Sequence, residues 1–199
     1  LSGGPSSVVG KKFPLPPSNL FDLGIPVLGI CYGLQVMMKL LGGKVDSGSG
    51  TSEFGRAILK KTDSNSKITN DLFFKGQEQV WMSHGDHVSG LSKGFEAIAS
   101  SEGAPFAIIA NDNNKLYGVQ FHPEVYHTTN GLKLLNNFLL ISGFSKNWSM
   151  GSFKEEKIND LKNQIGNKKV ICALSGGVDS SVTATLIHKA IGNKLTCIY

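Results

Sequence analysis

Cysteine is scarce in this chain, and its three residues lie far apart. Cys31, Cys172 and Cys197 form no C-x-x-C pair and leave an odd count, so we expect neither a disulfide framework nor a metal site of the zinc type. A reducing compartment, the cytoplasm, is the expected location. The sequence also lacks any run of about 18 consecutive apolar residues, so no membrane span is expected.

Charge of one sign is concentrated nowhere. The 20 Lys and Arg residues against 15 Asp and Glu residues give a net charge of +5 without a basic cluster. This balance argues against a nucleic-acid partner and weakly favours small anionic ligands. Hydrophobic residues make up 40% of the chain, enough for a sizeable core, which argues against disorder. Glycine is frequent, with 24 of 199 residues, against a usual share of roughly 7%, which favours tight turns and close backbone approach to ligands.

The two ends of the sequence have the pattern of cuts through a longer protein. Residues 1–5 include no Met and no signal-type apolar core, and residues 194–199 are a β-prone run that stops without a turn. The length of 199 residues suits one large domain, or one domain and part of another. We therefore expect a piece of a longer chain.

Alternating strand and helix patterns predict an α/β fold. An apolar strand at 26–30 precedes a helix at 34–41 that ends at Gly42 and Gly43, as in a strand covered on both faces. Further strands are predicted at 57–61, 79–83, 96–99, 106–110 and 116–121, with a hairpin turn at 111–114 and a helix at 130–141.

A second unit follows a break in periodicity at 142–150. It is predicted to contain a helix at 153–165, a strand at 168–174, a glycine-rich turn at 175–181, a helix at 182–191 and a strand from 194. This βαβ pattern indicates a second α/β domain. We set the limits at 1–145 for the first domain, 146–152 for a linker and 153–199 for the start of the second domain.

The first chemical motif is G-I-C-Y-G-L-Q, residues 29–35. It places Cys31 between two glycines at a strand-to-helix corner, the arrangement of a nucleophile elbow with cysteine in place of serine. The helix N-terminus favours a thiolate there. Taken alone, Cys31 is equally well interpreted as a buried core cysteine.

A histidine and a carboxylate favour the catalytic interpretation. Phe121-His122-Pro123-Glu124 follows a predicted strand. A thiol with an ordinary pKa of about 8.5 needs a base near neutral pH, and His122 can serve as that base. Glu124 can fix the tautomer of His122. An elbow cysteine followed by His-Pro-Glu therefore predicts a Cys-His-Glu triad.

These residues resemble those of the class I (triad-type) glutamine amidotransferase family. The resemblance implies a flavodoxin-like domain, a mixed sheet with helices on both faces, and catalytic roles for Cys31, His122 and Glu124. It also implies that the L-S-G-G-P stretch supplies an oxyanion-hole amide from Gly4 beside the Tyr32 amide. The glutamine-binding residues that it implies are Gln35 and the loop residues Ser83, His84, Gly85 and Asp86. By itself S-H-G-D is typical of a polar turn, and that interpretation stays open. The family's first strands are missing, and Tyr126 stands where the family often has Thr.

The second chemical motif is S-G-G-V-D-S-S at residues 175–181, between a predicted strand and a helix. Glycines there let backbone N–H groups approach phosphate oxygens. The motif is neither G-x-x-x-x-G-K-[ST] nor G-x-G-x-x-G, so the common nucleotide-binding loops do not apply. A serine-rich helix cap would explain the residue types but not two glycines directly after a strand.

This loop resembles the pyrophosphate-binding loop of the N-type ATP pyrophosphatases, an adenine-nucleotide α-hydrolase-like family. The resemblance implies ATP, with Mg²⁺, bound at Ser175, Gly176, Gly177, Val178, Asp179, Ser180 and Ser181. A triad amidotransferase domain followed by this loop is similar to the GMP synthetase family. That similarity implies glutamine, ATP and xanthosine monophosphate (XMP) as substrates of a ligase of purine biosynthesis, and a homodimer for the full-length protein.

Two other interpretations stay open. One is another amidotransferase-fed enzyme with the same loop, since acceptor-binding residues would lie beyond Tyr199. The other is a folded binding or regulatory module without turnover. A glutaminase assay separates an enzyme from a binding module.

Overall fold

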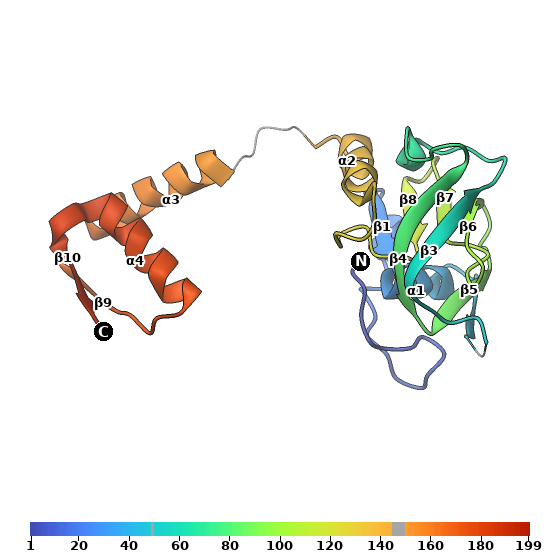
Figure 1. Ribbon diagram of the computed structural model, residues 1–199, viewed down its shortest axis with the longest axis horizontal. Coiled ribbons are helices and arrows are strands. Elements are labelled where there is room, and N and C mark those ends of the chain that lie inside the picture. Colours follow the sequence, from blue (N-terminus) through green and yellow to red (C-terminus); the bar gives the residue numbers. More distant parts are fainter. Residues whose placement is uncertain (49, 145–149) are drawn as a thin grey trace. The chain divides into compact units, whose positions relative to one another are not determined.

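The computed structural model describes residues 1–48, 50–144 and 150–199, and the chain divides into two compact units, Leu1–Phe144 and Ser145–Tyr199. Figure 1 shows both units, each of which is described below by itself. Among the described residues, no helix is both long enough and apolar enough to cross a membrane.

The first unit contains most of the regular structure. Its elements in chain order are η1 (Leu20–Asp22), β1 (Val27–Ile30), α1 (Tyr32–Leu40), β2 (Lys44–Ser47), β3 (Glu53–Lys61), η2 (Lys67–Thr69), β4 (Gln77–His84), β5 (Asp86–Gly90), β6 (Glu96–Ser100), β7 (Ile108–Asn111), β8 (Leu116–Val119) and α2 (Gly131–Ile141).

Six of the strands form one mixed sheet in the order β1-β8-β7-β6-β3-β4. Only β1 and β8 are parallel, and every other neighbouring pair is antiparallel. The β7–β8 pair closes at the predicted hairpin turn, with Asn111 opposite Leu116. Strands β2 and β5 form a separate antiparallel pair. The mixed sheet expected from the sequence is therefore confirmed.

Helices cover both faces of the six-stranded sheet. Successive residues of a strand point to opposite faces, and Ile108 and Ile109 of β7 accordingly belong to two different core clusters. Ile109 packs with Leu34 and Met37 of α1, whereas Ile108 packs with Leu134 of α2. Figure 1 shows α1 and α2 beside the sheet. This arrangement confirms the expected helices on both faces.

The strand boundaries differ from the sequence prediction at several points. β3 begins at Glu53 rather than at 57, and β4 extends from Gln77 to His84. β2 and β5 were not predicted. Each has a single buried apolar residue, Val45 or Val88, and one apolar residue gives no alternating pattern to detect.

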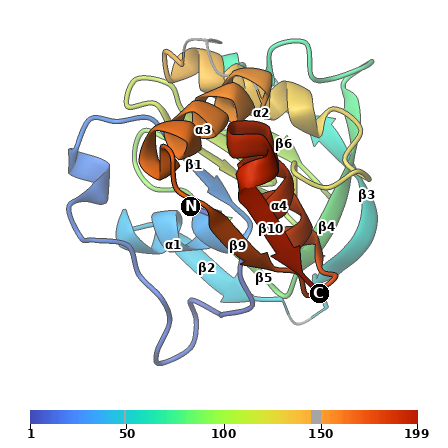
Figure 2. The same cartoon turned by 90° about the vertical axis from the view of Figure 1, so that its left-hand side faces the viewer.

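The second unit consists of α3 (Met150–Ile165), β9 (Val170–Ala173), α4 (Val178–Ile191), η3 (Gly192–Lys194) and β10 (Leu195–Ile198). β9 and β10 are parallel neighbours, as the βαβ pattern predicts. In Figure 2, α4 lies against these two strands with α3 beside it.

Two boundaries of the second unit correct the prediction. Helix α3 begins at Met150, so residues 150–152 of the expected linker are helical, while its residues 146–149 lie outside the described residues. Helix α4 begins at Val178 rather than at 182. Gly177, in an extended conformation, occupies the N-cap position, so Val178–Ser181 form the first helical turn instead of a loop.

Candidate active site

Cys31 lies at the corner between β1 and α1, in the N-cap position of the helix. Its backbone has φ 50° and ψ −108°, a region that residues other than glycine rarely adopt and that marks functional sites when the surrounding fold enforces it. Gly29 makes this corner possible, since a Cβ atom there would lie 2.7 Å from backbone atoms of Gly33 and Leu34. The corner has the sharp geometry that the G-x-C-x-G pattern predicts.

The Cys31 sulfur is held by groups from three other parts of the chain. The residue is buried, and its backbone N–H donates to the Val119 carbonyl at 2.7 Å. Its thiol donates to the Ser83 carbonyl at an Sγ–O distance of 3.6 Å, and the Gln120 side-chain amide donates to Sγ at 3.7 Å. The N-terminus of α1 adds positive potential that favours a thiolate.

His122 and Glu124 form an ion pair next to this sulfur. Nδ1 of His122 lies 2.7 Å from a Glu124 carboxylate oxygen. Hydrogen bonding to Cys31 is the largest cause that raises the pKa of His122, from 6.5 to about 9; burial lowers it, and Glu124 adds to the rise. His122 is therefore protonated at neutral pH, which suits an acid facing a thiolate.

Strand β4 holds the segment that carries His122. The backbone N–H of His122 donates to the Trp81 carbonyl at 3.0 Å. The buried Thr128 hydroxyl accepts from the Trp81 N–H at 3.1 Å and donates to the His122 carbonyl at 2.6 Å. The position of the imidazole thus depends on one strand through its backbone and one hydroxyl group.

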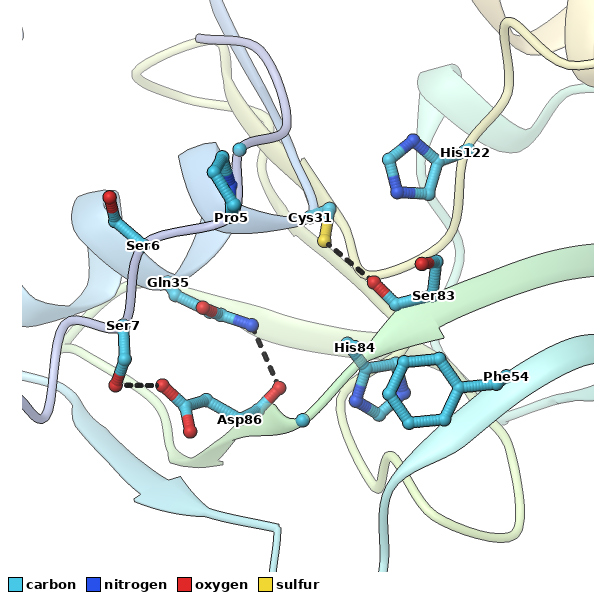
Figure 3. Close-up of a pocket in the computed structure, with 12 residues that line it drawn as sticks. Pro5, Ser6, Ser7, Cys31, Gln35, Phe54, Ser83, His84, Asp86 and His122 are labelled. Atoms are coloured by element: carbon cyan, nitrogen blue, oxygen red, sulfur yellow. Dashed lines mark hydrogen bonds between the residues drawn. The ribbon is translucent and has the colours of Figure 1, made fainter.

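A cavity of about 490 Å³ opens beside Cys31 and His122 (Figure 3). The other residues that line it are Gly4, Pro5, Ser6, Ser7, Gln35, Phe54, Ser83, His84, Gly85 and Asp86. Gln35 donates to the Asp86 carbonyl at 2.8 Å, and the Ser7 hydroxyl donates to the Asp86 carboxylate. Five of the residues proposed from the sequence for glutamine binding, together with Gly4, therefore lie around one cavity that also exposes the thiol and the imidazole.

The S-H-G-D segment differs from the expected loop. Ser83 and His84 end β4, Asp86 begins β5, and only Gly85 lies between the strands. The His84 side chain is fully buried, and its Nε2 lies 3.1 Å from the carboxylate of Glu53, its cross-strand partner on β3. His84 therefore packs its ring away from solvent, contrary to the expectation that it holds a ligand with its side chain.

Tyr32 and Gly3 complete the surroundings of the cysteine. The Tyr32 hydroxyl donates to the Pro14 carbonyl at 2.6 Å, so the side chain ties the N-terminal segment to α1. A Cβ atom on Gly3 would lie 2.8 Å from Cε1 of His122. The sequence analysis missed Gly3 and the buried Gln120. A polar residue inside the apolar stretch 116–121 was the available signal for Gln120.

The second motif forms an exposed corner between β9 and α4. Gly176 has φ +79°, and the Ser180 and Ser181 hydroxyls donate to the Gly177 carbonyl. N–H groups in the first turn of a helix lack partners within the helix, so this corner presents donors that fit a phosphate group. Within the described part of the chain, no cluster of three or more His, Cys, Asp or Glu residues could hold a metal ion. Asp179 is the carboxylate at the corner, and Mg²⁺ commonly binds through one or two carboxylates and substrate phosphates.

Comparisons with protein-family models match both units. Residues 1–142 match the model described as glutamine amidotransferase class-I, and residues 152–198 match the model described as NAD synthase.

Similar curated proteins cover the whole chain. It is 56% identical over 198 residues to a GMP synthase [glutamine-hydrolyzing] of Cereibacter sphaeroides and 54% identical to one of Dinoroseobacter shibae. In both cases the alignment covers all of this chain and 38% of the relative, so the chain spans little more than a third of their length. Among solved structures, a Thermoplasma acidophilum protein named after GMP synthase is similar with a TM-score of 0.57 and 29% identity, over 68% of this chain and 62% of that one.

Proposed function

The chain belongs to the class-I glutamine amidotransferase family, and on that premise we propose that its first unit hydrolyses glutamine at a Cys31-His122-Glu124 triad. The observation that carries the proposal is the strained Cys31 corner, which opens into a cavity also lined by His122. The 2.7 Å pair between His122 and Glu124 supports an acid held in a fixed orientation.

In the proposed reaction, the Cys31 thiolate attacks the side-chain carbonyl carbon of glutamine. The carbonyl oxygen becomes an oxyanion, which the backbone amides of Gly4 and Tyr32 stabilise. The protonated His122 then gives its proton to the departing nitrogen, so ammonia leaves and a thioester forms. A water molecule, deprotonated by His122, releases glutamate and regenerates the thiolate.

The surrounding residues have separate roles in this proposal. Glu124 holds the imidazole ring through Nδ1 and stabilises its positive charge. Gln35, Ser83, Gly85 and Asp86 line the cavity and bind the amino-acid end of glutamine. Since the His84 ring is buried against Glu53, His84 takes part through its backbone.

Glutamate release by the full-length protein tests this part of the proposal. Wild-type protein is expected to hydrolyse glutamine, and Cys31→Ala is expected to abolish hydrolysis while leaving the thermal unfolding temperature nearly unchanged. Cys197→Ala, at an exposed position in the second unit, is the matched control and keeps full activity. Equal activity of Cys31→Ala and wild type would refute the triad.

We further propose that the full-length protein is a GMP synthase. The similarity of the whole chain to proteins named GMP synthase [glutamine-hydrolyzing] supports this assignment. In this reaction the second unit binds ATP at residues 175–181 for adenylation of XMP, and ammonia from the first unit displaces AMP to give GMP. Mg²⁺, held by the phosphates and Asp179, supplies charge neutralisation of the phosphates.

Another acceptor is the second candidate function, because residues 152–198 match a family model described as NAD synthase. Release of pyrophosphate from ATP by the full-length protein decides between them. The proposal expects release with XMP and none with a deamidated nicotinamide dinucleotide. The opposite pattern would refute GMP synthesis and leave the glutaminase assignment intact.

The family resemblance also supports a homodimer and a cytoplasmic location for the full-length protein. Light scattering during size-exclusion chromatography tests the first, and fractionation of cells tests the second. A monomer at micromolar concentration would contradict the homodimer.

A further inference from the structure

Gln120 is a buried polar residue with no part in the mechanism described so far. It directly follows β8 and is fully buried, and its backbone N–H donates to the Ala107 carbonyl at 2.9 Å. An amide group withdrawn from water is costly unless it forms hydrogen bonds. The partners of its side chain therefore indicate why a polar residue occupies this place.

The hydrogen-bond partners fix the orientation of the Gln120 amide. The terminal nitrogen of Gln35 lies 2.8 Å from the Asp86 carbonyl, and a carbonyl only accepts, so this atom is an NH₂ group. The same NH₂ group lies 3.4 Å from one terminal atom of Gln120, which must therefore be the oxygen. The remaining terminal atom of Gln120 is its NH₂ group, and it lies 3.7 Å from Sγ of Cys31.

The sulfur thus has one neighbour that suits each of its protonation states. A thiol can donate to the Ser83 carbonyl at 3.6 Å, whereas a thiolate has no proton to donate there. The Gln120 NH₂ group donates to sulfur and forms a stronger bond with a thiolate, since hydrogen bonds to ions exceed neutral ones. Desolvation at this buried position disfavours the ion, so a donor is needed to offset it.

We propose that Gln120 is a catalytic residue that donates a hydrogen bond to Cys31 Sγ and stabilises the thiolate nucleophile. This inference rests on the proposed glutaminase function. It also gives Gln35 a second part besides lining the cavity, because Gln35 holds the Gln120 oxygen and so keeps the NH₂ group directed at the sulfur. Asp86, Gln35, Gln120 and Cys31 then form one chain of hydrogen bonds from the cavity to the nucleophile.

The test is the pH dependence of Cys31 alkylation in the full-length protein. Iodoacetamide reacts with the thiolate, and quantitative mass spectrometry of the Cys31 peptide gives the rate at each pH. In Gln120→Met, which keeps the length of the side chain but has no N–H donor, the pKa of the thiol should rise by about one to two units. Glutaminase kcat/KM at neutral pH should fall about 10- to 100-fold and partly recover at higher pH.

Gln120→Glu is the second variant, with the same number of side-chain heavy atoms and a negative charge in place of the donor. It should raise the thiol pKa at least as much, because like charges disfavour the thiolate. An alkylation profile identical to that of wild type in either folded variant would overturn the role of Gln120. A wild-type protein that does not hydrolyse glutamine would instead refute the proposed function, so the two failures are distinguishable.

Discussion

The reactivity of Cys31 depends on its position rather than on its exposure. Cys31 is buried, Cys172 is half-buried and Cys197 is exposed. A chloroketone analogue of glutamine should nevertheless label Cys31 selectively, because only Cys31 borders the glutamine cavity. Peptide mass spectrometry measures the label, and excess glutamine should slow it. Label found mainly on Cys172 would contradict the assignment.

The raised pKa of His122 gives a second prediction at the residue scale. Hydrogen bonding to Cys31 first, and Glu124 in addition, raise this pKa to about 9 although burial opposes them. The imidazolium that protonates the leaving nitrogen is therefore present at neutral pH and lost as the pH rises through about 9. Glutaminase kcat should fall over that range, and the stabilisation from the ion pair, complete below pH 6.5, should be lost over the same range.

Substitutions at the pair separate its two members. His122→Ala should lower the rate by about 10²–10⁴-fold. Glu124→Gln keeps a hydrogen-bond partner but removes the charge, so it should lower the rate less and move the alkaline limb of the pH profile to lower pH. An alkaline limb that stays in place would mean that Glu124 does not act on His122.

The segment from His122 to Thr128 is attached to β4, and this attachment gives a prediction at the scale of elements. Thr128 is buried, and its hydroxyl bridges the Trp81 N–H and the His122 carbonyl. Thr128→Val keeps the shape and removes both hydrogen bonds, so it leaves two buried backbone groups unsatisfied at about 1–3 kcal/mol each. Urea unfolding should show the loss.

Thr128→Ser is the matched control, because it keeps the hydroxyl and removes only a methyl group. It should retain most of the stability and nearly all of the glutaminase activity. Thr128→Val should lower kcat more than it changes KM, since it displaces His122 and not the glutamine-binding residues. Equal kcat values for the two variants would show that the hydroxyl does not position His122.

The sequence predicted those elements whose pattern is strong. The apolar run before Cys31 and the leucine-rich helix after Asn130 became β1 and α2 within one or two residues. β2 and β5 escaped prediction, because they bury one valine each and gain their partners only from folding. The start of α4 was placed four residues late, because small polar residues after Gly177 are typical of a turn as well as of a first helical turn.

The site was predictable where neighbours in the sequence define it. The Cys31 corner and the His122–Glu124 pair follow from spacing alone. The burial of the His84 ring could not be foreseen, because it depends on Glu53, 31 residues away, which becomes its partner only through the β3–β4 register. The contact between Gln120 and Cys31 likewise joins residues 89 positions apart.

At the scale of the whole molecule, the division into two compact units predicts separable losses of function. In the full-length protein, Cys31→Ala should abolish GMP formation from glutamine and preserve it from added ammonium salts. Asp179→Ala should abolish AMP formation with either nitrogen source and spare glutamine hydrolysis. Rates of glutamate, AMP and GMP formation measure both, and loss of ammonia-dependent synthesis in Cys31→Ala would contradict the division of labour.

Both halves of the triad refer to the same strand through backbone atoms. The Trp81 carbonyl and N–H hold the His122 segment, and two residues further along β4 the Ser83 carbonyl accepts from Cys31. During evolution these two positions can therefore exchange side chains freely, since every amino acid supplies a carbonyl. An insertion or deletion within β4 is not tolerated in the same way, because a shift by one residue would move the cysteine and the histidine out of step. Relatives should thus vary in the composition of this strand and keep its length.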